Sequence, residues 1–113
     1  MKPHQEPYSK HVFFCSGKFC DAQRRGIQLY NKFPHLLGDL ASYYNPERVK
    51  RGIAPCLGVC QSGPLMVVYP DGTWYHDVDD ARLVEIIKTH LREGQPVEEA
   101  VFHQLESAEP EFA

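Results

Sequence analysis

The chain holds four cysteines in two closely spaced pairs, Cys15 with Cys20 and Cys56 with Cys60. Each pair places two thiolates on one short loop, CSGKFC in the first case and CLGVC in the second. Soft sulfur ligands suit iron and zinc, and two such loops can hold the two irons of a [2Fe-2S] cluster. The spacing therefore predicts one [2Fe-2S] cluster per chain, with all four cysteines as metal ligands.

Glycines lie in or beside both cysteine loops, namely Gly17, Gly58 and Gly63. Glycine lets the backbone curl tightly around a sulfur atom and turn its N–H groups toward it. Such N–H groups stabilise a negatively charged sulfur and tune the reduction potential of a metal site. We therefore expect backbone N–H donors around the cysteine sulfurs.

Other chemistry of four cysteines stays open at this point. A zinc site with four thiolates is chemically possible, although zinc ribbons more often separate paired cysteines by two residues. Two disulfides would suit a secreted domain, but the N-terminal MKPHQEP lacks the apolar core of a signal peptide. A dithiol redox enzyme would need C-x-x-C, a spacing that neither pair has.

Histidine and serine side chains offer further alternatives, which the spacing does not favour. None of His11, His35 and His76 lies beside a cysteine pair as a Rieske-type site would need, so we expect them at the surface or at strand edges. Ser16 and Ser62 lie near the cysteines, where loop serines donate hydrogen bonds to sulfur or backbone more often than they act as nucleophiles. The sequence therefore predicts no catalytic residue.

Positive charge gathers near the first cysteine loop, at Lys18, Arg24 and Arg25. It could offset the negative charge of a cluster and offer a docking surface to an acidic partner. The same three residues would also fit an ordinary solvated helix face.

Length and composition point to one globular domain. The chain has 113 residues, of which 42% are hydrophobic, and this is enough for a single core. The formal net charge of -3 does not suggest a nucleic-acid surface, and no apolar run is long enough to span a membrane. Reduced cysteines and iron–sulfur chemistry fit a reducing cytoplasm, which is the predicted compartment.

The first cysteine pair is expected to lie between a strand and a helix. Val12 to Phe14 form a short buried strand, and the chain is expected to become helical from Asp21. Three apolar residues then share one helix face: Ile27, Tyr30 and Phe33. Pro34 should kink this helix or restart it over residues 35–43.

The second cysteine pair is expected to follow another strand, from Val49 to Ile53. Residues 65–69 and 73–75 flank the turn Pro70-Asp71-Gly72 and predict a hairpin. Residues 78–92 predict a helix with Asp79 as its cap and Gly94 just beyond its end. Its apolar face is expected to consist of Val84, Ile87 and Leu91.

This order of elements predicts an α/β fold of the thioredoxin-like kind. The helical crossover should make the first two strands parallel, and the hairpin should add antiparallel strands, giving a mixed central sheet of about four strands with flanking helices. We expect residues 1–10 to be a flexible lead-in, 11–94 to be the domain and 95–113 to be a C-terminal tail.

Several runs resemble the thioredoxin-like [2Fe-2S] ferredoxins of the Shethna type. The similarity rests on PCLGVCQSGP at 55–64, VVYPDG at 67–72 and WY at 74–75, and it extends through GQPV at 94–97, so that it covers roughly residues 11–98. The resemblance implies the same four ligands, Cys15, Cys20, Cys56 and Cys60. It also implies electron transfer with redox partner proteins, and a homodimer.

One departure concerns the first loop, because Shethna-type proteins commonly carry a longer stretch between their first two cysteines. The C-x4-C spacing here is similar to that of the [2Fe-2S] subunit of NADH dehydrogenase.

Together, the four cysteines and the resemblance predict a small soluble one-electron carrier rather than an enzyme. The alternatives are a structural or partner-binding domain with a zinc site and a cluster-bearing accessory subunit of a larger oxidoreductase.

Overall fold

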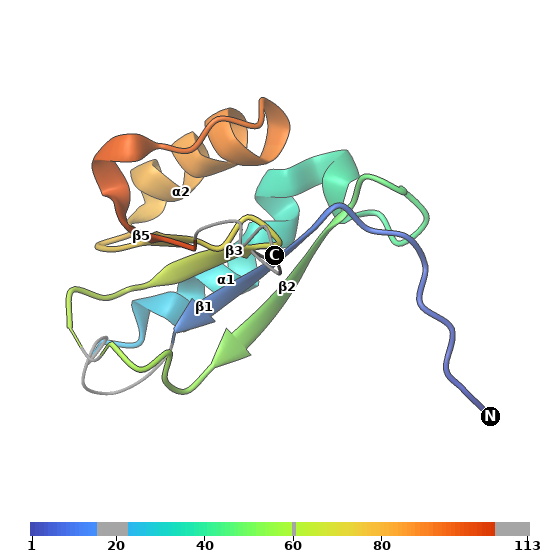
Figure 1. The fold of residues 1–113 in the computed structure, drawn as a ribbon, viewed down its shortest axis with the longest axis horizontal. Coiled ribbons are helices and arrows are strands. Elements are labelled where there is room, and N and C mark those ends of the chain that lie inside the picture. Colours follow the sequence, from blue (N-terminus) through green and yellow to red (C-terminus); the bar gives the residue numbers. More distant parts are fainter. Residues whose placement is uncertain (16–22, 60, 106–113) are drawn as a thin grey trace, which may run out of the picture.

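The computed structural model describes residues 1–15, 23–59 and 61–105 of the chain (Figure 1). Within these residues, five strands form one mixed sheet in the order β2-β1-β3-β4-β5. The strands are β1 (Lys10–Cys15), β2 (Val49–Ala54), β3 (Met66–Tyr69), β4 (Thr73–Tyr75) and β5 (Val101–Gln104). The predicted α/β class with a mixed central sheet is confirmed.

Strand directions follow from the connections between the strands. β2 returns parallel to β1 after a helical crossover, and β3 pairs antiparallel with β1. The predicted hairpin is present, since β3 and β4 are antiparallel and the N–H of Gly72 donates to the carbonyl of Val68 at 2.7 Å. Gly72 has a φ of 69°, a conformation that glycine adopts without steric cost, so the turn residue fits its position.

Helix α1 (Arg25–Leu37) connects β1 to β2. It runs through Pro34 without restarting at residue 35, and a short 3-10 turn, Gly38–Ala41, follows it. In the described residues α1 begins at Arg25, and the predicted helix start at Asp21 lies outside them.

Helix α2 (Asp80–Ile86) continues as a π-helical stretch, Ile87–Arg92. Asp79 caps it as predicted, because the Asp79 carboxylate accepts the N–H of Arg82 at 2.8 Å. None of the helices in the described part of the chain is long and apolar enough to cross a membrane.

Both helices pack on the same face of the sheet. The core there combines sheet residues such as Phe14 and Val68 with Phe33 of α1 and Leu83 of α2. The expected apolar face of α2 is partly wrong: Val84 is 41% exposed, while Ile87 is buried as expected. The buried side of α2 consists instead of Leu83, the residue before Val84, and Ile86.

The opposite sheet face carries a row of half-buried aromatic side chains, and no helix of the described residues covers it. His11 stacks on Phe13 with 4.3 Å between ring centroids, and Phe13 meets Tyr69 edge-on at 6.2 Å. On the neighbouring strands, Trp74 contacts His103 edge-on at 6.1 Å. Cross-strand rings of this kind stabilise a sheet from its open side.

The segment after residue 94 contributes a strand that the sequence did not predict. A 3-10 turn, Glu98–Ala100, leads into β5, which pairs antiparallel with β4 and brings the sheet from about four strands to five in the described residues. β5 is short and mostly exposed, so it lacks the buried alternation that marks a strand in sequence. The domain limits at residues 10 and 94 stay a prediction.

Candidate metal centre

Cys15 is the last residue of β1, and its side chain is completely buried. Its N–H donates to the carbonyl of Leu65 at 3.0 Å. Leu57 and Val59, which belong to the second cysteine loop, pack against the small cluster that Cys15 forms with Leu65. The end of β1 and the second cysteine loop therefore share one apolar cluster.

Cys56 follows β2 by two residues, and its side chain is exposed. The N–H of Gly58 donates to the sulfur of Cys56 at 3.2 Å, and Gly58 has a φ of 85°. A backbone in this left-handed conformation can turn its N–H toward a sulfur only two residues earlier. The expected N–H donor to a cysteine sulfur is thus confirmed at Gly58.

Parallel pairing brings the two cysteine-bearing strand ends together. Cys15 lies opposite Ala54 in the register of β1 and β2, so both strands deliver their cysteine loops to the same edge of the sheet. Cys20 and Cys60 lie outside the described residues. The ligand set of four cysteines stays a prediction.

Arg25 and Ser62 also make hydrogen bonds close to the second cysteine loop. Arg25 reaches the carbonyl of Gly63 at 3.4 Å, which places a positive charge beside the second cysteine loop. The carbonyl of Ser62 accepts a hydrogen bond from the N–H of Asp77 at 2.7 Å. Gly17, Ser16 and Lys18 lie outside the described residues.

The histidines weighed as alternative ligands lie apart from one another. His11 is on β1, where burial and then the charge of Lys50 lower its pKa. His35 is exposed on α1. His76 lies 2.6 Å from Asp77 and lines a cavity of about 210 Å³ with residues of the second cysteine loop. In the described part of the chain, no three His, Cys, Asp or Glu side chains gather as a metal site.

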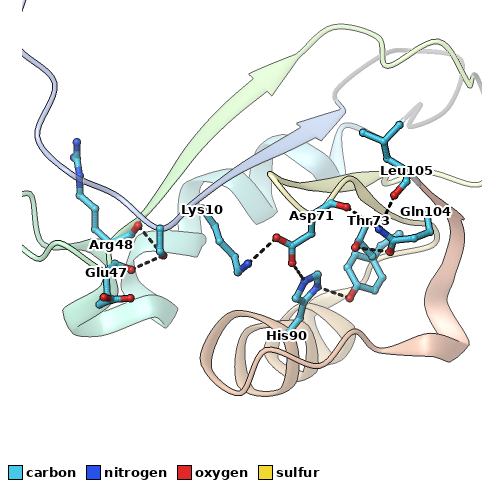
Figure 2. A network of polar contacts seen from close by, with 10 residues as sticks. Lys10, Glu47, Arg48, Asp71, Thr73, His90, Gln104 and Leu105 are labelled. Atoms are coloured by element: carbon cyan, nitrogen blue, oxygen red, sulfur yellow. Dashed lines mark hydrogen bonds and ion pairs between the residues drawn. The ribbon is translucent and has the colours of Figure 1, made fainter. Parts of the chain in front are cut away.

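A buried polar network that the sequence did not predict lies at the other end of β1 (Figure 2). His90 is 1% exposed; its Nε2 lies 2.6 Å from the Asp71 carboxylate, and its Nδ1 lies 2.7 Å from the hydroxyl of Tyr75. Lys10 donates to the other oxygen of Asp71 at 2.7 Å. The N–H of Val97 donates to the Tyr75 hydroxyl at 3.0 Å.

The partners of each group fix the direction of these hydrogen bonds. The Asp71 carboxylate can only accept, so Nε2 of His90 donates to it; Nδ1 of the neutral ring then accepts the hydrogen of Tyr75, whose oxygen accepts from Val97. Tyr75 is completely buried, so its hydroxyl cannot meet a substrate as the nucleophile of a triad would. The network joins β1, the turn between β3 and β4, β4 and the π-helical stretch after α2.

The network also shifts the pKa values of its members. Burial raises the pKa of Tyr75 to about 12, and the negative charges of Asp71 and Glu98 act in the same direction. Burial alone would raise the pKa of Asp71, but the hydrogen bonds from Lys10 and His90 and the positive charge of Lys10 outweigh it and lower this pKa. Sequence could not show this network, because its bonded side chains lie 15, 19 and 61 residues apart.

Comparison with known proteins places this fold among iron–sulfur proteins. No family model matches the chain. A [2Fe-2S] ferredoxin of Clostridium pasteurianum is 29% identical over 92 residues, which cover 77% of this chain and 89% of that protein. A [2Fe-2S] ferredoxin of Aquifex aeolicus is 48% identical over 46 residues, a segment that spans 41% of each protein.

The solved structures extend this similarity over most of the chain. The crystal structure of the wild-type thioredoxin-like [2Fe-2S] ferredoxin from Aquifex aeolicus matches with a TM-score of 0.69 and 30% identity, over 85% of this chain and 98% of that one. Sequence and fold thus agree along nearly the whole of this relative. The chain belongs to the thioredoxin-like [2Fe-2S] ferredoxin family, as its motifs predicted.

Proposed function

We propose that this protein binds one [2Fe-2S] cluster and carries single electrons between redox partner proteins. One observation carries the proposal: β1 and β2 are parallel and bring Cys15 and Cys56 to the same sheet edge. Each of these cysteines has its pair partner, Cys20 or Cys60, only a few residues further along the chain. The names of the relatives, which are [2Fe-2S] ferredoxins, support the same cofactor.

The described residues suit a thiolate-bound cluster. Cys15 is shielded from water by an apolar cluster, and Cys56 has a backbone N–H directed at its sulfur. The N–H of Gly58 stabilises negative charge on that sulfur, and Arg25 adds positive charge near the second loop. When bound, the cluster supplies reversible one-electron oxidation and reduction.

Two alternatives compete with this proposal. A zinc site would use the same four thiolates but would make the protein a structural or partner-binding domain. An accessory subunit of a larger oxidoreductase would keep the cluster and change only the physiological assignment; stable co-purification with a flavin-bearing or hydrogenase-like partner would favour it. No catalytic residue is proposed, because electron transfer needs none on the carrier itself.

The test is a visible absorption spectrum of anaerobically purified protein before and after dithionite, with iron and acid-labile sulfide assayed on the same sample. We expect absorption bands that bleach on reduction and about two irons and two sulfides per chain. A colourless sample that holds zinc, even after reconstitution with iron and sulfide, would overturn the proposal.

The ligand assignment needs its own test at the cysteines that lie outside the described residues. Cys20→Ser is expected to lower the cluster content and to change the spectrum, because serine oxygen replaces a thiolate ligand. Ser16→Ala is the matched control on the same loop. If Cys20→Ser left iron content and spectrum unchanged, Cys20 would not be a ligand.

The finer assignments are a homodimer and a cytoplasmic location. The aromatic face of the sheet, which no helix of the described residues covers, supports a dimer, because such a face would gain from being covered. A reducing cytoplasm keeps cysteine thiols available for cluster assembly, which supports that compartment.

A further inference from the structure

A groove runs along the outer edge of the sheet, between β2 and α1. It has a volume of about 350 Å³, and the buried core residues Phe33, Leu37 and Val49 close its inner side. β2 is the edge strand on this side, and it pairs only with β1 among the described residues. Edge strands leave backbone N–H and C=O groups available to another chain.

The three rim cations come from one stretch of chain: Arg48 and Arg51 line the groove, whereas Lys50 directs its ammonium group to the other face of the sheet. The guanidinium of Arg51 lies 3.9 Å from the Tyr30 ring centroid and also donates to the Tyr30 carbonyl. Arg48 lies 4.7 Å from the ring centroid of Tyr43. These aromatic and carbonyl contacts hold the cations in place without neutralising them.

Lys50 is held in a similar way on the other side of the strand. Its Nζ donates to the side-chain carbonyl of Gln5 at 2.7 Å and lies 4.7 Å from the ring centroid of Tyr8. Side chains that are already positioned lose less conformational entropy when they bind a partner. The three rim cations are therefore prepared for an anionic ligand.

Within the described residues, none of the three rim cations has a carboxylate partner. Other basic side chains of the same protein are paired: Lys10 with Asp71, Lys32 with Asp80, Arg82 with Glu85 and Arg92 with Asp39. The whole chain has a net charge of -3, so the groove reverses the overall sign of the molecule. Local positive potential of this kind selects acidic partners.

We infer that this groove binds an extended acidic segment of a partner protein, which lies along the outer edge of β2. The partner's carboxylates meet Arg48 and Arg51 at the groove and Lys50 on the other face of the strand. Its apolar side chains contact the exposed Leu36 and Ile53. Backbone pairing with an exposed strand edge supplies the remaining affinity, as in other cases of strand addition. A free small anion would not reach cations on both faces of β2.

Exposed apolar side chains on the same elements fit this partner. Leu36 of α1, Ile53 of β2 and Tyr43 in the segment that connects them are exposed. Exposed apolar residues beside a charged rim are typical of interaction surfaces. β2 also leads into the loop of Cys56, so a segment bound here lies next to the proposed metal centre. The groove itself contains no cysteine, and the inference can fail independently of the proposed function.

The test uses the full-length, cluster-loaded protein and a fluorescein-labelled peptide of alternating glutamate and valine, equal in length to the six-residue β2. Fluorescence anisotropy gives the Kd at about 50 mM and about 300 mM salt, since exposed charges are screened over this range. We expect binding that weakens with salt, and no binding of a matching lysine–valine peptide.

Two double variants compare equal losses of charge. Arg48→Gln with Lys50→Gln is expected to weaken peptide binding about tenfold, whereas Lys32→Gln with Lys88→Gln is expected to leave the Kd unchanged. Arg51 is kept, because it also contacts α1. Cluster absorption of each variant is recorded, so that loss of the proposed metal centre is seen separately from loss of peptide binding.

Three outcomes would overturn the inference. The first is no peptide binding at low salt, and the second is equal weakening in both double variants. The third concerns the acidic C-terminal sequence, which contains Glu106, Glu109 and Glu111. If peptide binding appeared only after all three were changed to glutamine, the occupant would be this segment rather than a partner. Protection of β2 amides from hydrogen exchange in the wild-type complex would support the inference.

Discussion

The two described cysteines have opposite surroundings, although both lie at the same sheet edge. Cys15 is completely buried beside Leu65, whereas Cys56 is exposed and has its sulfur bonded to the N–H of Gly58. Electron transfer requires close approach of a partner on one side and exclusion of water on the other. For the proposed cluster, we therefore expect a redox partner to approach from the side of the Cys56 loop.

This difference predicts unequal effects of the same substitution. Cys15→Ser and Cys56→Ser should both lower iron content, because each removes a proposed thiolate ligand. Cys15→Ser additionally places a hydroxyl in an apolar cluster, which costs about 1–3 kcal/mol of the free energy of unfolding. Urea unfolding of the two variants, each compared with the other, measures this difference. Equal free energies of unfolding would contradict the buried position of Cys15.

Tyr75 provides a prediction for pH. A pKa raised above its ordinary value means that the folded protein favours the neutral hydroxyl. The resulting stabilisation is complete below pH 10 and is lost as the pH rises toward about 12. We expect the free energy of unfolding to fall by about 1–3 kcal/mol more in the wild type than in Tyr75→Phe over this range. Urea unfolding at about pH 9 and about pH 11.5 checks it.

The control for that experiment is Tyr44→Phe, since Tyr44 is 80% exposed. This variant should follow the wild type at every pH, because its hydroxyl is hydrated in both states. If Tyr75→Phe showed the same pH dependence as the wild type, the Tyr75 hydroxyl would not be held by Val97 and His90 as described.

At the scale of elements, sequence patterns predicted those parts of the fold whose signals are local. The hairpin followed from β-rich runs around Pro70-Asp71-Gly72, and the start of α2 followed from Asp79. The predicted buried face of α2 was partly wrong, because Val84 is apolar yet 41% exposed. Packing against the sheet, rather than apolar spacing alone, decides which side of the helix faces inward. The network at His90 depends wholly on long-range contacts, so no local pattern could reveal it.

β5 was not predicted for a similar reason, because a long-range contact with Gly72 holds its end in place. The N–H of Leu105 donates to the carbonyl of Gly72 at 2.8 Å, and a Cβ at Gly72 would clash with the Leu105 side chain. The hairpin turn and the end of β5 therefore fit together only if residue 72 is glycine. This contact joins residues far apart in sequence, beyond the reach of a strand pattern.

A pair of glycine substitutions tests this contact. Gly72→Ala and Gly94→Ala both introduce a side chain at positive φ, which costs about 1–2 kcal/mol of the free energy of unfolding. Only Gly72→Ala also displaces Leu105, so it should cost about 1–3 kcal/mol more than Gly94→Ala, which has open space around it. Urea unfolding compares the variants, and hydrogen exchange at the Leu105 amide should accelerate only in Gly72→Ala. Equal effects in both assays would contradict the packing of Leu105 on the turn.

At the scale of the whole molecule, the two sheet faces have different roles. One face holds both helices and the core, and the other presents aromatic side chains such as Phe13 and Tyr69 without a helix over them in the described residues. Sequence predicted flanking helices but not that both lie on one side, because the side that a helix takes depends on the crossover and on packing rather than on periodicity. The open face is the natural place for the proposed dimer contact.

A single charge at the centre of this face tests the proposed dimer. Phe13 lies on β1 between His11 and Tyr69, so Phe13→Glu would place a carboxylate in the middle of the shared surface. Light scattering after gel filtration should give twice the 12.9 kDa chain mass for the wild type and the single mass for Phe13→Glu. Val84→Glu, on the exposed side of α2, is the control and should stay dimeric. A wild-type monomer would refute the dimer, and a Phe13→Glu dimer would move the contact away from the open sheet face.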